Sequence, residues 1–297
     1  MTDLLKGLTG GGWAAVYAWI FPSALAVGLF WLFVYPQIDG PLRDHFEKLS
    51  GVQQGGVFLT LACVLGLILN AISTPLYRVL EGYAWPSALR RRGVGRQRAI
   101  KKQLEKEVRG QGWEAGLQLE RLARFPIDDE QVAPSRLGNA LRAFETYGKT
   151  RFNLDSQTLW NELCTVVPKY LQDELDRSRS GVDFFVALFY LSAVFGIATI
   201  GFGLAEHAKT GILILAVPAF ASMVLWYQMA VVSTSYWKTN VQALVNLGRK
   251  KLAEEMGLQI PDSIDDEREM WGLLTDFVYC ANDASAKELD KFRKREN

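Results

Sequence analysis

The sequence predicts an all-α, polytopic helical membrane protein with four transmembrane helices in two hairpins and a helical cytosolic domain. Four long runs lack any charged residue, Lys and Arg gather on one side of those runs, and no segment shows the alternation typical of strands. A bilayer core needs about 20 apolar residues in a helix. Helices buried in soluble proteins rarely remain uncharged over that length.

The uncharged runs cover residues 13–35, 55–77, 184–205 and 211–237. Their internal Gly and Pro are tolerated in membrane helices, because neighbouring helices satisfy the freed backbone groups. The first run is too long for a signal peptide, and the flank before it carries only one Lys and one Asp.

The charge distribution sets the expected orientation. Residues 78–109 hold ten basic residues against three acids, whereas residues 36–54 hold two against three. Because basic residues favour the cytosolic side, we expect both termini in the cytosol of a bacterium and the protein in its inner membrane. The predicted parts are a cytosolic N-terminus (1–12), a first hairpin (13–77), a cytosolic helical insert (78–181), a second hairpin (182–237) and a cytosolic helical tail (238–297).

Several local patterns predict the helices of the insert and tail. Ile100, Leu104 and Val108 recur at helical spacing, whereas Pro86, Gly93 and Gly95 predict a turn before them. Ser135 and Asp155 are typical N-caps, and Pro168 suits the first turn of a helix that continues into the third span. The tail is expected to hold two helices, 240–256 and 265–279, separated by Pro261.

Neutral side chains within the runs suggest two kinds of contact. Small residues that let helices approach closely share one face of the third run: Ser192, Gly196, Thr199 and Gly203. They pack helices either within one molecule or between subunits. Polar groups lie in the second and fourth runs: Asn70, Ser73, Thr74 and Gln228. These either form hydrogen bonds between helices or line a pore after oligomerisation.

The basic stretch RRRGVGRQR follows the second run. Arg90, Arg91 and Arg92 are interpreted as topological anchors near the headgroups. The candidates for binding an anion or polyanion lie further along: Arg96, Arg98, Lys101, Lys102, Arg136, Arg142 and Arg151. Structural ion pairing, such as Arg142 with Glu145, is the alternative interpretation.

No motif indicates an enzyme. The GKT at residues 148–150 lacks the upstream glycine and the strand of a phosphate loop, and no hydrolase, metalloprotease or kinase motif occurs. The chain has no CxxC and only two His, so neither a metal site nor a cofactor is expected. Two acidic IDDE loops, 127–130 and 264–267, are interpreted as solvated.

The stretch RLGNALRAFETY…RFNLDSQTLW, within residues 136–160, resembles a pattern in uncharacterised bacterial four-span membrane proteins: RLGN, LRA, E and Y, then RYGLD and WPRL. Here Phe152-Asn153 replaces Tyr-Gly and Asn161-Glu162 replaces Pro-Arg. No chemistry is assigned to that family. In plan such proteins are similar to membrane effectors of bacterial anti-phage systems, including the Hailong effectors, which oligonucleotides made by a partner enzyme control.

Two functions are therefore expected as alternatives. The first is an oligomeric, pore-forming or ion-channel-like membrane effector in antiviral defence. Its cytosolic helices would respond to a nucleotide or oligonucleotide ligand or to a partner. The second is a membrane-anchored scaffold that recruits a cytosolic partner protein without forming a pore. Membrane lipids and further copies of the chain are the other expected partners.

Overall fold

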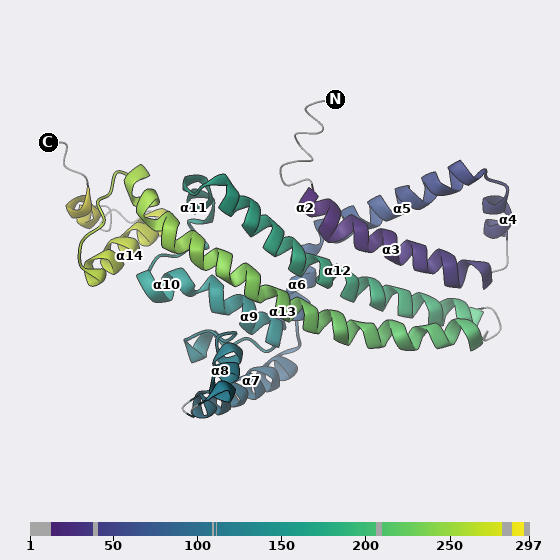
Figure 1. The fold of residues 1–297 in the computed structure, drawn as a ribbon, viewed down its shortest axis with the longest axis horizontal. Coiled ribbons are helices and arrows are strands. Elements are labelled where there is room, and N and C mark those ends of the chain that lie inside the picture. Colours follow the sequence, from purple (N-terminus) through teal and green to yellow (C-terminus); the bar gives the residue numbers. More distant parts are fainter. Residues whose placement is uncertain are drawn as a thin grey trace. The chain divides into compact units, whose positions relative to one another are not determined.

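The computed structural model describes residues 13–37, 41–108, 110, 112–205, 210–280 and 287–293 (Figure 1). Expectations for residues 1–12 and for the loop at 206–209 lie outside these residues. Within the described residues all regular structure is helical, which confirms the all-α prediction. Four helices are long and apolar enough to cross a membrane: Trp13–Gln37, Gly51–Ala71, Lys169–Leu204 and Leu213–Glu255.

The elements follow one another with short connections. The first membrane-length helix is built from α2 (Trp13–Ala15), the π-helical turn η2 (Val16–Ile20), α3 (Phe21–Leu29), the π-helical turn η3 (Phe30–Val34) and the 3-10 turn η4 (Tyr35–Gln37). The remaining helices are α4 (Pro41–Glu47), α5 (Gly51–Ala71), α6 (Ser73–Glu81), α7 (Ser87–Glu107), α8 (Trp113–Leu122), α9 (Arg136–Glu145), α10 (Tyr147–Phe152), α11 (Trp160–Val166), α12 (Lys169–Ala205), α13 (Thr210–Glu255) and α14 (Ile264–Cys280), with 3-10 turns η5 (Asp129–Gln131) and η6 (Asp290–Phe292).

The chain divides into two compact units. The first unit comprises Met1–Val79 and Arg179–Ser233, and the second comprises Leu80–Ser178 and Thr234–Asn297. Helices α12 and α13 each take part in both units as single uninterrupted helices. This differs from the prediction for the tail, because the helix expected at 240–256 is the continuation of α13 and ends at Glu255.

In the first unit, α5 lies against the helix that contains α3 (Figure 1). Gly66 permits the contact, because a Cβ atom at that position would lie 2.8 Å from the backbone Cα of Ile20. The start of α5 is fixed by a capping box, in which the Ser50 side chain accepts from the Gln53 amide and the Gln53 side chain accepts from the Ser50 amide. The helix therefore begins at Gly51, four residues before the predicted run.

The second predicted run, 55–77, is not one helix. α5 ends at Ala71, and α6 begins at Ser73 after Ile72, which has φ −98° and ψ 13°. Pro75 explains the break, because it has no N–H to donate to the Ala71 carbonyl and its ring would clash with that group. The α6 segment is held to α12 by hydrogen bonds from Tyr77 Oη to Asp183 Oδ1 (2.6 Å) and from Tyr190 Oη to the Leu76 carbonyl (2.7 Å).

The core of the second unit joins α9, α11, α13 and α14. Its largest fully buried side chains include Leu137, Leu163, Leu244, Leu252 and Trp271. The predicted cap at Ser135 is present, because its side chain accepts from the Gly138 amide. Asp155 caps the turn before α11 through the amides of residues 157 and 158, so the helix starts later, at Trp160.

The turn predicted at Gly93 and Gly95 is wrong, because α7 is one helix from Ser87 to Glu107 with Pro86 at its N-cap position. Gly93 serves close packing instead of a turn. A Cβ atom there would lie 2.8 Å from both the Cβ and the carbonyl oxygen of Pro134. At Gly95 nothing lies within 4 Å of the corresponding position. The basic stretch is therefore helical, with one glycine facing a neighbour and the other facing open space.

This pair gives a matched test of packing. Gly93→Ala is expected to destabilise the second unit by about 1–3 kcal/mol, because it overpacks a contact with backbone atoms. Gly95→Ala is expected to stabilise α7 by up to about 1 kcal/mol, because Ala has the higher helix propensity. Hydrogen–deuterium exchange of the α7 and α9 amides measures both changes. Shifts of the same sign and size in the two variants would contradict the assigned contact.

Candidate functional site

The RLGN sequence anchors the loop before α9, which forms one wall of a pocket in the second unit. The Asn139 side chain bridges the loop before α9: its Oδ1 accepts from the Ala133 amide at 2.8 Å, and its Nδ2 contacts the carbonyls of Ala133 (3.1 Å) and Ser135 (2.9 Å). The same amide nitrogen lies 3.3 Å from Gln97 Oε1 on α7. Asn139 is 1% exposed, so this buried amide fixes the loop against α7.

Two glycines explain how closely this loop and the start of α9 approach the end of α6. At Gly138 a Cβ atom would lie 2.7 Å from the Glu81 carbonyl oxygen. Gly82 has φ +89°, and a Cβ there would lie 2.7 Å from Pro134 Cγ. Three of the RLGN residues therefore have structural roles. Leu137 fills the core, Gly138 permits close contact with the Glu81 carbonyl group, and Asn139 forms hydrogen bonds with the backbone of the loop.

Between this loop, α7 and α9 lies an open pocket of about 400 Å³. Its lining is Tyr83, Arg90, Arg91, Val94, Gly95, Arg98, Glu130, Gln131, Val132, Ala133, Pro134 and Arg142. Four of these residues are arginine and one is glutamate, so the pocket concentrates positive charge. On α7 the lining residues recur at i, i+4 and i+8 (Arg90, Val94, Arg98), which places them on one helix face.

The arginines differ in how they are engaged. Arg142 Nε donates to Tyr83 Oη at 2.9 Å, and its guanidinium lies 3.8 Å from the Glu145 carboxylate. Arg98 Nε donates to the Asp129 carbonyl at 3.0 Å. In the described part of the chain, neither Arg90 nor Arg91 has a carboxylate within 4.0 Å. Two exposed arginines therefore line the pocket without an ion-pair partner among the described residues.

Burial raises the pKa of Tyr83 above its usual value, against the opposing effect of Arg142. The phenol therefore stays protonated at neutral pH and retains a proton to donate. Burial also raises the pKa of Glu145, an effect that Arg142 opposes. The pocket thus presents guanidinium and hydroxyl donors, which are the groups that bind phosphate and carboxylate oxygens.

For Lys101, one of the predicted anion-binding residues, the prediction is wrong. It is 4% exposed, and its Nζ donates to Asp129 Oδ1 at 2.6 Å and to the Ile127 carbonyl at 2.8 Å. The Lys101 hydrogen bond lowers the pKa of the Asp129 carboxyl group. Its charge is committed to an internal ion pair with the first IDDE loop, so it is not available to a polyanion. Residues 127–130 are all exposed, in agreement with a solvated loop, and the ion pair with Lys101 holds that loop in place at Asp129.

The structure brings together only part of the predicted anion-binding set. Arg98 and Arg142 meet at the pocket. Arg96, Lys102, Arg136 and Arg151 are exposed and do not line it. Arg90 and Arg91, interpreted from the sequence as topological anchors, line the pocket instead. The spacing of Arg90 and Arg98 places them on one face of a continuous helix. The sequence does not indicate this on its own, because a turn is expected at Gly93.

The small-residue face lies where α12 meets α13. A Cβ atom on Gly196 would lie 2.9 Å from the Phe220 ring, and one on Gly203 would lie 2.7 Å from the Leu213 side chain. Ser192 Oγ accepts from Trp226 Nε1 at 3.1 Å. Thr199 is buried and its hydroxyl donates to the Gly196 carbonyl. These residues therefore make contacts within one molecule.

The polar residues of the second and fourth runs do not share one environment. Asn70 and Thr74 are exposed on either side of the α5–α6 break, and Ser73 is half-buried there. Gln228 is half-buried and has an interaction partner. Among the residues described, no three His, Cys, Asp or Glu side chains are grouped to hold a metal ion.

Guanidinium and phenol groups therefore share the lining of this pocket with one carboxylate, that of Glu130. Comparisons of the chain with protein families, with curated proteins and with solved structures find no match.

Proposed function

We propose that the protein is a multi-pass membrane effector of the bacterial inner membrane whose helical unit binds a phosphate-bearing ligand, a nucleotide or oligonucleotide, in the arginine-lined pocket. The four spans form two hairpins, and both termini face the cytosol. The observation that carries the proposal is the pair of exposed Arg90 and Arg91 side chains, which have no ion-pair partner among the described residues, beside Arg98 and Arg142. Arginine forks match the geometry of phosphate oxygens.

Ligand binding is proposed to control a pore made by several copies. Helices α12 and α13 each contribute residues to both units, which supports a coupling between ligand binding and the spans. The exposed amide of Asn70 supports oligomerisation, because an amide facing hydrocarbon needs a polar partner or water. The function in this proposal is not enzymatic, because the sequence carries no hydrolase, metalloprotease or kinase motif.

One observation favours a scaffold as the second candidate function. Helix α8 buries none of its residues, and Trp113 and Leu117, which share one helix face, are 75% and 47% exposed. An exposed apolar face of this kind is suited to a cytosolic partner protein. A scaffold would recruit this partner at the membrane and would need no pore.

The test uses the full-length protein in vesicles of phosphatidylethanolamine and phosphatidylglycerol loaded with K⁺. ATP and 5′-phosphorylated triadenylate serve as probes. A pore controlled at the pocket predicts K⁺ release that depends on a probe, together with oligomers trapped by chemical cross-linking. A bound probe without K⁺ release from a monomer would overturn the pore and favour the scaffold. Extraction of the chain from membranes by alkaline carbonate would overturn the membrane placement itself.

A further inference from the structure

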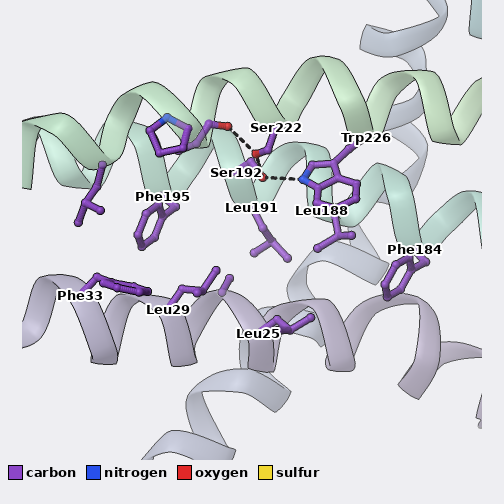
Figure 2. A pocket seen from close by; sticks show the side chains of 14 residues that line it. Leu25, Leu29, Phe33, Phe184, Leu188, Leu191, Ser192, Phe195, Ser222 and Trp226 are labelled. Carbon is purple, nitrogen blue, oxygen red and sulfur yellow. Dashed lines mark hydrogen bonds between the residues drawn. The ribbon is translucent and has the colours of Figure 1, made fainter.

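The first unit contains an apolar cavity of about 600 Å³ between α3 on one side and α12 with α13 on the other. Figure 2 shows Leu25, Leu29 and Phe33 on the α3 side, facing Leu188, Leu191 and Phe195 of α12. Ala26, Phe184, Ser192, Leu215, Pro218, Ala219, Ser222 and Trp226 complete the lining. All of these residues belong to the helices that are long and apolar enough to cross a membrane.

Aromatic contacts join the helix of residues 13–37 to α12 near Phe184 and near Phe202. Phe184 stacks on Tyr17 (5.1 Å between ring centroids) and on Phe21 (6.3 Å). The ring of Phe30 lies 5.6 Å from that of Phe202. Tyr17 and Phe30 lie in the π-helical turns that flank α3. These contacts join the helix of residues 13–37 to α12 through large side chains.

The side chains that line the cavity favour a hydrocarbon ligand over a polar one. Its polar side chains already bond to one another: Trp226 Nε1 and Ser222 Oγ each donate to Ser192 Oγ at 3.1 Å (Figure 2). The remaining walls are aliphatic and aromatic carbon. A polar ligand would lose its hydration there without gaining partners. A cavity of this size left empty would forfeit packing energy comparable with the net stability of a domain.

The cavity opens onto a surface that is itself apolar. Leu25, Leu29 and Phe33 line it and remain 44%, 44% and 43% exposed. If these helices cross the bilayer, as in the proposed function on which this step rests, the medium at the opening is lipid. We propose that the cavity is a binding site for one acyl chain of a membrane phospholipid, held between α3, α12 and α13.

The test uses the full-length protein in vesicles of phosphatidylethanolamine and phosphatidylglycerol that contain a phospholipid with a diazirine in its acyl chain. Illumination attaches the lipid to nearby side chains, and mass spectrometry of peptides locates the products. We expect higher yields at the lining residues Leu191 and Phe195 than at Val194 and Val224, which are exposed and line no part of the cavity.

Two substitutions to Trp separate a specific site from general lipid contact. Ala26→Trp fills the cavity and is expected to reduce the yield at Leu191 and Phe195 to that at Val224. Ala221→Trp, on an exposed position outside the lining, is expected to leave all yields unchanged. Leu29→Trp is a second filling variant should the first one misfold, as judged by its elution in size-exclusion chromatography.

Two results would overturn the proposal and differ in what else they exclude. Equal yields at lining and exposed residues, or equal effects of Ala26→Trp and Ala221→Trp, would show that no acyl chain is held, while lipid still surrounds the helices. Absence of labelling at every residue would show that the helices are not in the bilayer, and would also overturn the proposed membrane placement.

Discussion

Replacing Arg90 and Arg91 together with alanine is expected to weaken binding of ATP or 5′-phosphorylated triadenylate about 100-fold. Each arginine supplies charge-assisted hydrogen bonds worth about 1.5 kcal/mol in an exposed pocket, and each 1.4 kcal/mol is about tenfold in affinity. Neither side chain is buried or ion-paired among the described residues, so the fold should be retained. Isothermal titration calorimetry of the detergent-solubilised protein measures the dissociation constants.

The matched control is the double variant Arg92→Ala/Arg96→Ala. It removes the same charge from the same helix, but neither residue lines the pocket. Its expected effect is a small loss that disappears at high salt, because only long-range attraction changes. If both double variants lose affinity equally, the basic helix attracts anions without a defined site. If the unaltered protein binds neither probe, the assigned ligand class is wrong.

The second large effect is expected at the buried pair of Arg249 and Glu267 in the second unit. Arg249 Nε lies 2.8 Å from Glu267 Oε1, and the two side chains are 17% and 6% exposed. Trp271 Nε1 also donates to Glu267 Oε1, at 3.2 Å. The Arg249 guanidinium lies 4.3 Å from the centre of the Phe152 ring. Glu267→Leu would leave both donors without an acceptor, in a site that water enters poorly.

Removing one partner of a buried ion pair costs about 3–5 kcal/mol, so Glu267→Leu should sharply raise hydrogen exchange in α13 and α14. Adding Arg249→Leu should restore much of the loss, since the unpaired charge is then absent. Glu269→Leu, two residues away, breaks an exposed pair with Lys291 and should cost at most about 1 kcal/mol. Equal exchange in the Glu267 and Glu269 variants would contradict the assigned role of the buried pair.

The sequence predicts the helices well where the signal is local. Uncharged length identified the four membrane-length helices, and Ser135 and Pro168 correctly marked the starts of α9 and α12. Pro75 was the missed local signal, because a proline inside an apolar run both ends α5 and begins α6.

The sequence predicts the anion-binding residues less well, because the pocket depends on contacts between residues that are distant along the chain. Glycine inside a helix can mark a turn or a close approach, and only the position of Pro134 shows that Gly93 is the second kind. Lys101 and Arg98 look equivalent in the sequence, yet one is buried against Asp129 and the other reaches the pocket. Which basic residue is free depends on the loop that packs over α7, and spacing along α7 alone does not reveal it.

The contact between Gly93 and Pro134 links two positions that lie 41 residues apart in the sequence. In descendants of this chain the two should covary: a side chain larger than hydrogen at 93 becomes tolerable only if the loop at 134 is reshaped. Position 82 gains no such freedom, because its φ of +89° favours glycine whatever residue stands at 134. An alignment of relatives should therefore show position 82 more constant than position 93.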